Sequence, residues 1–212
     1  YPDGKATPPA EEVQAVVDVK SLLRVGNFWW IALSVGCCFA CFSGVMVNLV
    51  PMAIDQGASS QKAAFLMSFS AFLGLAGKGL VGFASDKVSP RMSLSIPMLS
   101  MIVACLILRG HPDYHQMAIG SCFLGLAAGG TIPVWGALIG RYFGREAFPM
   151  VMGLMNPLFV PLIISGPIAA AYINDVYGSY DNAFVMFIVV MLMALMISSR
   201  LKDGHASDLI SN

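Results

Sequence analysis

One basic residue stands alone within a long apolar part of this sequence. Lys78 is the only charged residue between Lys62 and Asp86. A charge inside a membrane helix costs at least about 2.5 kcal/mol on insertion scales, so it needs a polar partner or a polar surrounding. Gly74, Lys78 and Gly82 recur at intervals of four residues and therefore share one narrow face of a helix. Glycines on such a face indicate close helix packing or a cavity wall rather than contact with lipid.

Three roles are open for Lys78 on this evidence. Its ammonium group binds the carboxylate of a small anion, pairs with a structural carboxylate, or snorkels to the membrane surface. Lys78 lies eight residues before Asp86, which is about 12 Å along a helix axis. At that depth below the membrane surface, the side chain reaches the surface only with difficulty. A role in a substrate cavity and a structural ion pair are therefore the main alternatives.

The remaining reactive side chains do not form a catalytic or metal-binding pattern. The sequence contains no G-x-x-x-x-G-K-[ST] phosphate-binding pattern and no evident nucleophile–base pair. Cys37, Cys38 and Cys41 lie within an apolar run and are interpreted as packing residues. His111 and His115 flank a turn and are interpreted as solvated loop residues. We therefore expect no metal and no other cofactor, and a six-helix membrane enzyme is the weaker alternative to a transporter.

Composition places the chain in a membrane. Its 212 residues are 57% hydrophobic and only 11% charged, whereas a soluble domain carries about 25% charged residues to cover its surface. The mean hydropathy is +0.74. The 12 basic residues balance the 12 acidic ones, so no net charge attracts nucleic acid. Membrane lipid is the expected surrounding, and nucleic acid is not an expected partner.

Long uncharged runs between short charged clusters predict six transmembrane helices. A bilayer core about 30 Å thick needs roughly 20 apolar residues in helical form. The predicted helices cover residues 27–52, 62–84, 92–109, 115–139, 147–173 and 182–200. Residues 1–26 are expected to form a cytoplasmic linker with an amphipathic helix near Glu12–Val25, residues 27–200 the bundle, and residues 201–212 a cytoplasmic tail.

The distribution of basic residues predicts that both termini are cytoplasmic. The loops on one side of the six spans, with the two ends of the chain, carry far more cations than the loops on the other side. The first group is Lys5, Lys20, Arg24, Lys87, Arg91, Arg141, Arg145, Arg200 and Lys202, and the second is Lys62 and Arg109. We expect a multi-pass protein of a plasma or inner membrane.

The loop after the second predicted helix carries a recognisable pattern. Gly82-x-x-x-Asp86-Lys87-x-x-x-Arg91 resembles the cytoplasmic loop signature of the major facilitator superfamily. The resemblance implies that these residues form a charge relay that latches one state of the gate, although Ser89 and Pro90 replace the usual Gly and cation. Arg141 and Arg145, in the other cytoplasmic loop, complete the predicted gating set.

The resemblance also implies an architecture. Asp86 and Asp175 follow the second helix of successive helix triplets, on opposite sides of the membrane, as an inverted three-plus-three repeat requires. The implied fold is all-α, with six transmembrane helices forming the C-terminal half of a twelve-helix transporter. The implied partner is an N-terminal six-helix half before Tyr1.

A narrower resemblance concerns the branch of monocarboxylate porters and oxalate/formate antiporters. Arg141-Tyr-Phe-Gly144 and Gly166-Pro167 are similar to segments of that branch. The resemblance implies that Lys78 is a ligand for a substrate carboxylate. The second cation of the antiporter pattern is absent between Met150 and Gly166, where Asn156 and Ser165 are the candidate hydrogen-bonding side chains. A monocarboxylate is therefore favoured over a dianion, with Lys78 and Asn156 as the candidate substrate-binding residues.

Small residues, prolines and aromatic residues indicate how the helices pack. Gly125, Gly129, Gly136 and Gly140 form two G-x-x-x-G spacings, which together with Gly74 predict close helix contact. Prolines in the fourth and fifth helices predict kinks that line a pathway or only shape the bundle. The aromatic residues near helix ends are expected at the membrane interfaces, namely Trp29, Trp30, Trp135 and Tyr142.

Together these features predict half of a secondary active transporter. It would move a small organic anion by alternating access, in symport with a proton or in antiport with a second anion, because the sequence offers no ATP site. A channel or membrane scaffold is a further alternative, which the gate-type loop disfavours.

Overall fold

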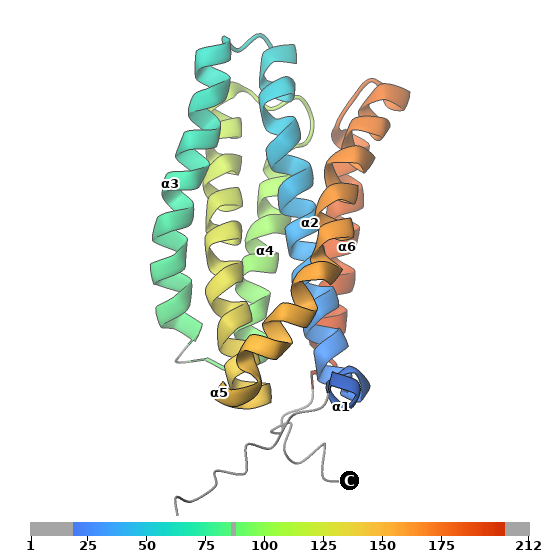
Figure 1. The fold of residues 1–212 in the computed structure, drawn as a ribbon. Helices are drawn as coiled ribbons and strands as arrows, with labels where there is room; N and C mark the ends of the chain where they lie inside the picture. The colour runs from blue at the N-terminus through green and yellow to red at the C-terminus, as the bar shows by residue number, and fades with distance from the viewer. Residues whose placement is uncertain (1–18, 86–87, 202–212) are drawn as a thin grey trace, which may run out of the picture.

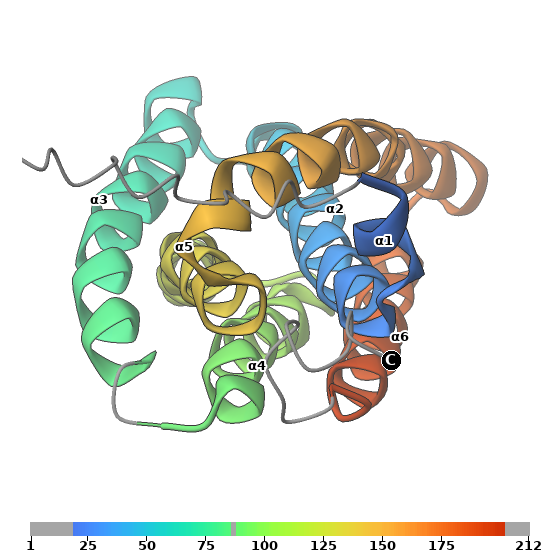
Figure 2. The same cartoon turned by 60° about the horizontal axis from the view of Figure 1, so that its bottom comes forward.

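The computed structural model describes residues 19–85 and 88–201, and in these ranges the chain is helical without strands. The helices are α1 (Val19–Arg24), α2 (Gly26–Asp55), α3 (Ser60–Ser85), α4 (Pro90–Leu108), α5 (Tyr114–Tyr177) and α6 (Asp181–Ser198). Figure 1 shows α2 to α6 as an upright bundle, with α1 at its lower end. Seen from that end, α2 and the first part of α5 lie in the middle, and the other helices surround them (Figure 2).

Helix α5 crosses the bundle twice. It has 64 residues and is interrupted at Gly144, whose backbone is non-helical with φ 78° and ψ 173°. Positive φ is favourable for glycine because it has no Cβ. Figure 1 shows α5 descending to this point and then returning, so it has a first limb before Gly144 and a second limb after it. Five described helices are long and apolar enough to cross a membrane. Since α5 crosses twice, the described chain has six spans, which confirms the predicted all-α membrane fold.

The helix ends lie within a few residues of the predicted bounds, and local capping explains several of them. The Asp113 carboxylate accepts a hydrogen bond from the Gln116 backbone N–H at 2.7 Å, and the Gln116 side chain accepts one from the Asp113 N–H at 2.9 Å. This capping box begins α5. Ser89 caps α4, and Pro90 stands in its first turn, where its missing N–H costs nothing. The two predicted helices 115–139 and 147–173 are the two limbs of α5.

Only part of the predicted terminal segments lies in the described ranges. Of the amphipathic helix expected near Glu12–Val25, the structure describes α1, in which Leu22 is fully buried while Val19 and Leu23 are exposed. One apolar side chain thus fixes α1 to the bundle. Of the tail, only the buried Leu201 is described.

Small residues set two close helix contacts. A Cβ atom built on Gly125 or Gly129 would overlap the carbonyl oxygen of Ser70 or Gly74, respectively, so the first limb of α5 touches the backbone of α3. A Cβ built on Gly166 would likewise overlap the carbonyl oxygen of Ala40, so the second limb touches the backbone of α2. These contacts join the fourth span to the second and the first span to the fifth. The predicted inverted repeat relates the first span to the fourth and the second span to the fifth, so it also relates these two contacts to each other.

A buried amide strengthens the contact between α2 and the second limb. The Asn48 Nδ2 donates to the Gly44 carbonyl at 2.8 Å within α2 and to the Pro167 carbonyl across the contact at 3.5 Å. The Tyr180 hydroxyl donates to the Asn48 Oδ1 at 3.4 Å. Asn48 is buried, and these bonds satisfy its polar atoms.

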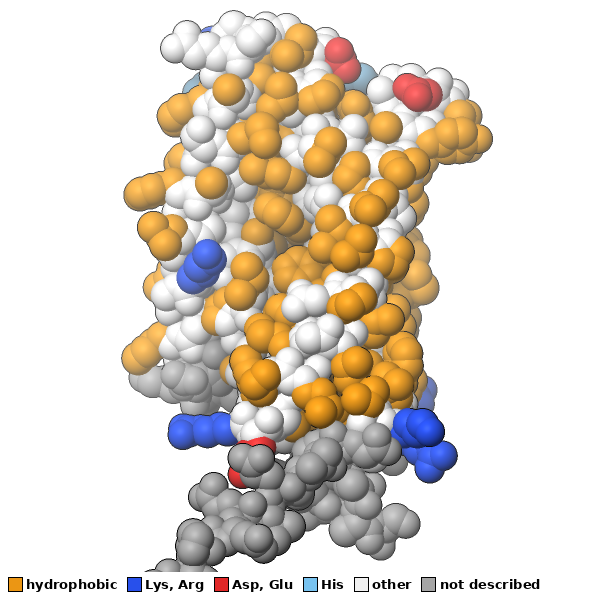
Figure 3. All heavy atoms as spheres, in the orientation of Figure 1, with side chains coloured by type: hydrophobic (Ala, Val, Ile, Leu, Met, Phe, Trp, Pro, Cys, Tyr) orange, Lys and Arg blue, Asp and Glu red, His pale blue; other side chains and the backbone are white. Residues whose placement is uncertain are grey.

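The outer surface has the character of a membrane protein. Figure 3 shows hydrophobic side chains over the flank of the bundle, with most basic groups at the lower end, one basic group on the flank itself, and acidic groups at both ends. Large apolar side chains of α3 are mainly exposed, including Phe72, Leu75, Leu80 and Phe83. Water is a poor solvent for such a flank, whereas lipid tails suit it.

The contact between Gly129 and Gly74 predicts a position-specific loss of stability. Gly129→Ala would push the first limb away from α3, and overpacking of this kind costs about 1–3 kcal/mol. Gly140→Ala is the matched control, because a Cβ at Gly140 meets nothing within 4 Å. Thermal unfolding in detergent should therefore show a lower midpoint for Gly129→Ala and an unchanged or higher one for Gly140→Ala. Equal midpoints for the two variants would contradict the contact.

Candidate functional site

A hollow lies between α2 and the two limbs of α5. Its volume is about 640 Å³, which is within the usual range of ligand pockets. Apolar and small residues line it together with one amide. The lining residues are Phe39, Ile132, Trp135, Gly153, Asn156, Pro157, Phe159, Val160 and Ile163. None of them is charged, so the hollow suits an apolar group better than an ionised one.

Three aromatic rings form the floor of the hollow. The ring centroids of Trp135 and Phe159 are 5.2 Å apart, those of Phe39 and Phe159 are 5.4 Å apart, and those of Phe39 and Trp135 are 6.3 Å apart. All three pairs meet edge to face, a favourable arrangement of aromatic quadrupoles. The Trp135 indole N–H donates to the Met155 sulfur at 3.3 Å. The rings therefore hold one another in fixed positions.

This arrangement corrects part of the prediction for the aromatic residues. Trp135 and Tyr142 are buried in the bundle, so their side chains pack against other helices and do not face a membrane interface. Trp29 and Trp30 are exposed near the lower end, as expected of interfacial residues, and the Trp29 indole N–H donates to the Leu23 carbonyl at 2.8 Å. Nearness to a helix end was a poor guide for Trp135 because the neighbouring helices cover it.

Asn156 supplies the polar side chain of the hollow. Its Nδ2 donates to the Met152 carbonyl at 3.0 Å, and its side chain is exposed. A primary amide carries two N–H bonds, so one stays available for a ligand. Pro157 and Pro161 have no N–H to donate to the carbonyls four residues before them, which belong to Gly153 and Pro157. The second limb thus offers a donor and backbone acceptors near the hollow.

Lys78 does not line the hollow. It is exposed on α3, and it makes no hydrogen bond or ion pair with other described residues. On the same ridge, Gly74 packs on the Gly125 carbonyl, and a Cβ at Gly82 would lie 3.8 Å from the Pro133 Cβ. Lys78 therefore projects from the edge of the contact between α3 and the first limb. The structure does not bring Lys78 and Asn156 into one pocket, since Asn156 lines the hollow and Lys78 does not.

The predicted gating residues gather at the lower end, as far as the structure describes them. Asp86 and Lys87 lie outside the described residues. The Arg91 guanidinium donates to the carbonyl oxygen of Leu201, just beyond the end of α6, so it ties the start of α4 to that end. Arg141 and Arg145 are exposed on either side of the break at Gly144. Their gating role stays a prediction.

The predicted packing glycines fall into two groups. Gly74, Gly125 and Gly129 lie at the close contact between α3 and the first limb. Gly136 and Gly140 do not face a neighbouring backbone: a Cβ at Gly136 would meet only Phe148 at 4.0 Å, and one at Gly140 would meet nothing within 4 Å. The second G-x-x-x-G spacing thus has no close contact within this part of the chain.

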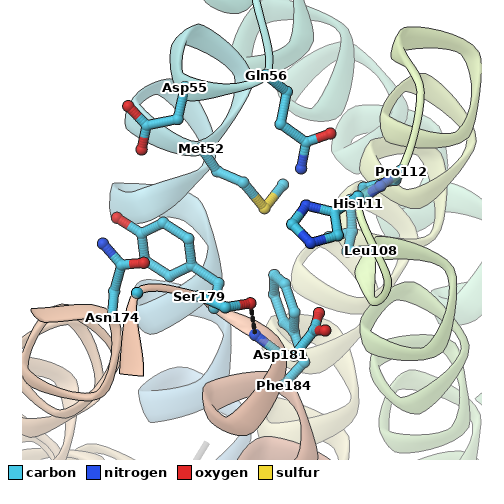
Figure 4. Close-up of a pocket in the computed structure, with 12 residues that line it drawn as sticks. Met52, Asp55, Gln56, Leu108, His111, Pro112, Asn174, Ser179, Asp181 and Phe184 are labelled. Atoms are coloured by element: carbon cyan, nitrogen blue, oxygen red, sulfur yellow. Dashed lines mark hydrogen bonds between the residues drawn. The ribbon is translucent and has the colours of Figure 1, made fainter. Parts of the chain in front are cut away.

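Sequence reasoning missed a polar pocket at the upper end, shown in Figure 4. Its volume is about 190 Å³, and the end of α2 and the two loops that precede α5 and α6 line it. The Asp181 carboxylate accepts a hydrogen bond from the Gly110 N–H at 2.8 Å. Burial raises the pKa of Tyr180, and the nearby carboxylates of Asp55 and Asp175 raise it further. The pocket joins three segments that are far apart in sequence, so no local motif marks it.

Comparisons with known proteins identify the family of the chain. A family model described as the Major Facilitator Superfamily matches residues 31–208. Monocarboxylate transporter 12 of Rattus norvegicus is 25% identical over 206 residues, which are 90% of this chain and 41% of that protein. Monocarboxylate transporter 2 of Homo sapiens is 26% identical over 151 residues, 69% of this chain and 32% of that protein. The chain thus spans less than half the length of these relatives.

Proposed function

Because the chain belongs to the major facilitator superfamily, we propose that it is part of a secondary active transporter for a small organic anion of the monocarboxylate type. The family and the apolar helices make it an integral, multi-pass membrane protein and a transporter rather than an enzyme. Lys78 is the observation that carries the anion assignment, since it is a cation within an apolar span and has no partner among the described residues. The relatives are named monocarboxylate transporters, which supports the same substrate class.

The proposed mechanism divides the work between Lys78 and the second limb of α5. The Lys78 ammonium binds the carboxylate as a point charge. The spare N–H of Asn156 donates to an oxygen of the same substrate. In alternating access, this site opens first to one side of the membrane and then to the other. Since the sequence has no ATP-binding pattern, the energy comes from a proton moving with the substrate or from exchange for a second anion.

A six-helix half preceding Tyr1 completes the proposed transporter. The relatives are more than twice as long as the part that this chain matches, and a cavity wall needs an opposing wall. The coding sequence upstream of Tyr1 should therefore encode six further uncharged runs of about 20 residues each. An upstream sequence without such runs would contradict the proposal for this partner.

The proposed orientation places the lower end of the bundle in the cytoplasm. Basic loops stay on that side during membrane insertion, and the lower end holds Arg141 and Arg145. Single cysteines at Arg145 and Asp113, in a cysteine-free background, should differ in labelling by an impermeant maleimide on intact cells. Asp113→Cys should be labelled, and Arg145→Cys should be labelled only after permeabilisation. The reverse pattern would invert the topology.

Substitution of Lys78 tests the anion-binding role. A hydrogen bond between a charged donor and a carboxylate contributes about 1.5–3 kcal/mol, so Lys78→Ala should weaken substrate binding roughly 10- to 100-fold. Lys78→Arg should retain part of the binding because the charge remains. Uptake of radiolabelled pyruvate by the full-length protein, at a concentration below half-saturation, measures the effect.

The matched control is Lys62→Ala. Lys62 stands in the first turn of the same helix, with its ammonium 5.6 Å from the centre of the Tyr114 ring, away from the proposed site. Its removal should leave uptake unchanged at equal expression. Uptake that survives Lys78→Ala would remove Lys78 from the substrate site.

A further inference from the structure

We propose that the hollow formed by α2 and the two limbs of α5 is the subsite for the apolar body of the substrate. The transported anions are then monocarboxylates with a branched aliphatic or aromatic body rather than the smallest acids. This inference rests on the proposed function, because it assigns a second part of the same substrate site.

The chemistry of the lining favours an apolar group. No charged residue lines the hollow, so nothing in it neutralises a carboxylate. Trp135 and Phe159 are buried beneath it, and Ile132, Val160 and Ile163 are exposed at its rim. A ligand body placed there covers apolar surface that otherwise stays exposed, which is favourable. The carboxylate must lie outside the hollow, and Lys78 stands on the helix packed against the limb that carries Ile132.

The size of the hollow selects a larger body. Its volume of about 640 Å³ corresponds to on the order of twenty water molecules at about 30 Å³ each. A three-carbon acid would leave most of that space filled with water. A branched aliphatic or phenyl group removes more apolar surface from water, and each added CH₂ group is worth about 0.8 kcal/mol, or about fourfold in affinity.

A lipid tail is a poorer occupant of the hollow than a substrate. The amide of Asn156 keeps one N–H without a partner among the described residues, and the carbonyls of Gly153 and Pro157 lose their usual helical donors to Pro157 and Pro161. Hydrocarbon cannot hydrogen-bond to these groups, so covering them with an acyl chain is costly. A polar-headed molecule with an apolar body meets both requirements.

The test compares acids that share one head group. Half-saturation concentrations for pyruvate, 3-methyl-2-oxobutanoate, 4-methyl-2-oxopentanoate and phenylpyruvate are measured by uptake with the full-length protein. Affinity should rise along the first three acids, with 4-methyl-2-oxopentanoate at least about tenfold better than pyruvate. Phenylpyruvate should also bind better than pyruvate.

A substitution that fills the hollow provides the structural control. Gly153 lines the hollow, and a Cβ there meets nothing within 4 Å, so the Cβ of Gly153→Leu has open space and the rest of its side chain takes up volume in the hollow. It should reduce the preference for the larger acids to about threefold or less while pyruvate uptake persists. Gly140→Leu, equally unobstructed but outside the hollow, should keep the full preference.

The outcomes separate this inference from the proposed function. Uptake of pyruvate that depends on Lys78, without any preference for larger acids, would overturn the subsite and leave the proposed function standing. A preference that Gly153→Leu leaves intact would likewise place the apolar body elsewhere and overturn the subsite. If none of the acids is transported, both the proposed function and the subsite are wrong.

Discussion

The hydrocarbon core of a bilayer cannot satisfy polar groups, and this constraint governs the whole structure. Each backbone N–H and C=O must find its partner within the protein, which explains why the described spans are helical. Departures from helical geometry occur where other partners are available. Gly144 interrupts α5 at the lower end, between the exposed Arg141 and Arg145, and His111, with φ of 56°, lies in the loop at the upper end.

Lipid also removes the usual reason for helices to associate. Apolar side chains gain little by leaving lipid for protein, so close van der Waals contact of backbones takes over. Gly129 against Gly74 and Gly166 against Ala40 provide such contact at two places. These contacts hold the first limb to α3 and the second limb to α2. The part of the second limb that precedes Gly166 lines the hollow, together with residues of α2 and of the first limb.

The same physics explains what could be predicted from the sequence. Charges are excluded from the core, so uncharged runs marked the six spans, and the spacing of Gly125 and Gly129 indicated a close contact. The partner of these glycines, Gly74, could be inferred only because it lies on a glycine-rich face of its helix.

The aromatic floor could not be predicted, because Phe39, Trp135 and Phe159 come from three spans and each looks like an ordinary apolar residue. The upper pocket was hidden for the same reason. The break at Gly144 was expected only as a loop between two helices, since the sequence does not show that the non-helical backbone narrows to a single glycine.

The hollow and the flexibility of the second limb have a common origin. Pro157 and Pro161 each remove one backbone hydrogen bond, and a helix bends most easily where such bonds are missing. The freed carbonyls belong to Gly153 and Pro157, and both residues line the hollow. Gly153 has no side chain and therefore leaves room for a ligand. A change in the bend of this limb therefore changes the shape of the hollow, and a molecule that fills the hollow resists that change. Trp135 and Phe39 stand on the first limb and on α2, so these two rings do not move with the bend of the second limb. A substrate body in the proposed subsite would therefore lie between Trp135 on the first limb and a second limb that can bend, and a difference in its affinity for the two bends would couple binding to helix movement.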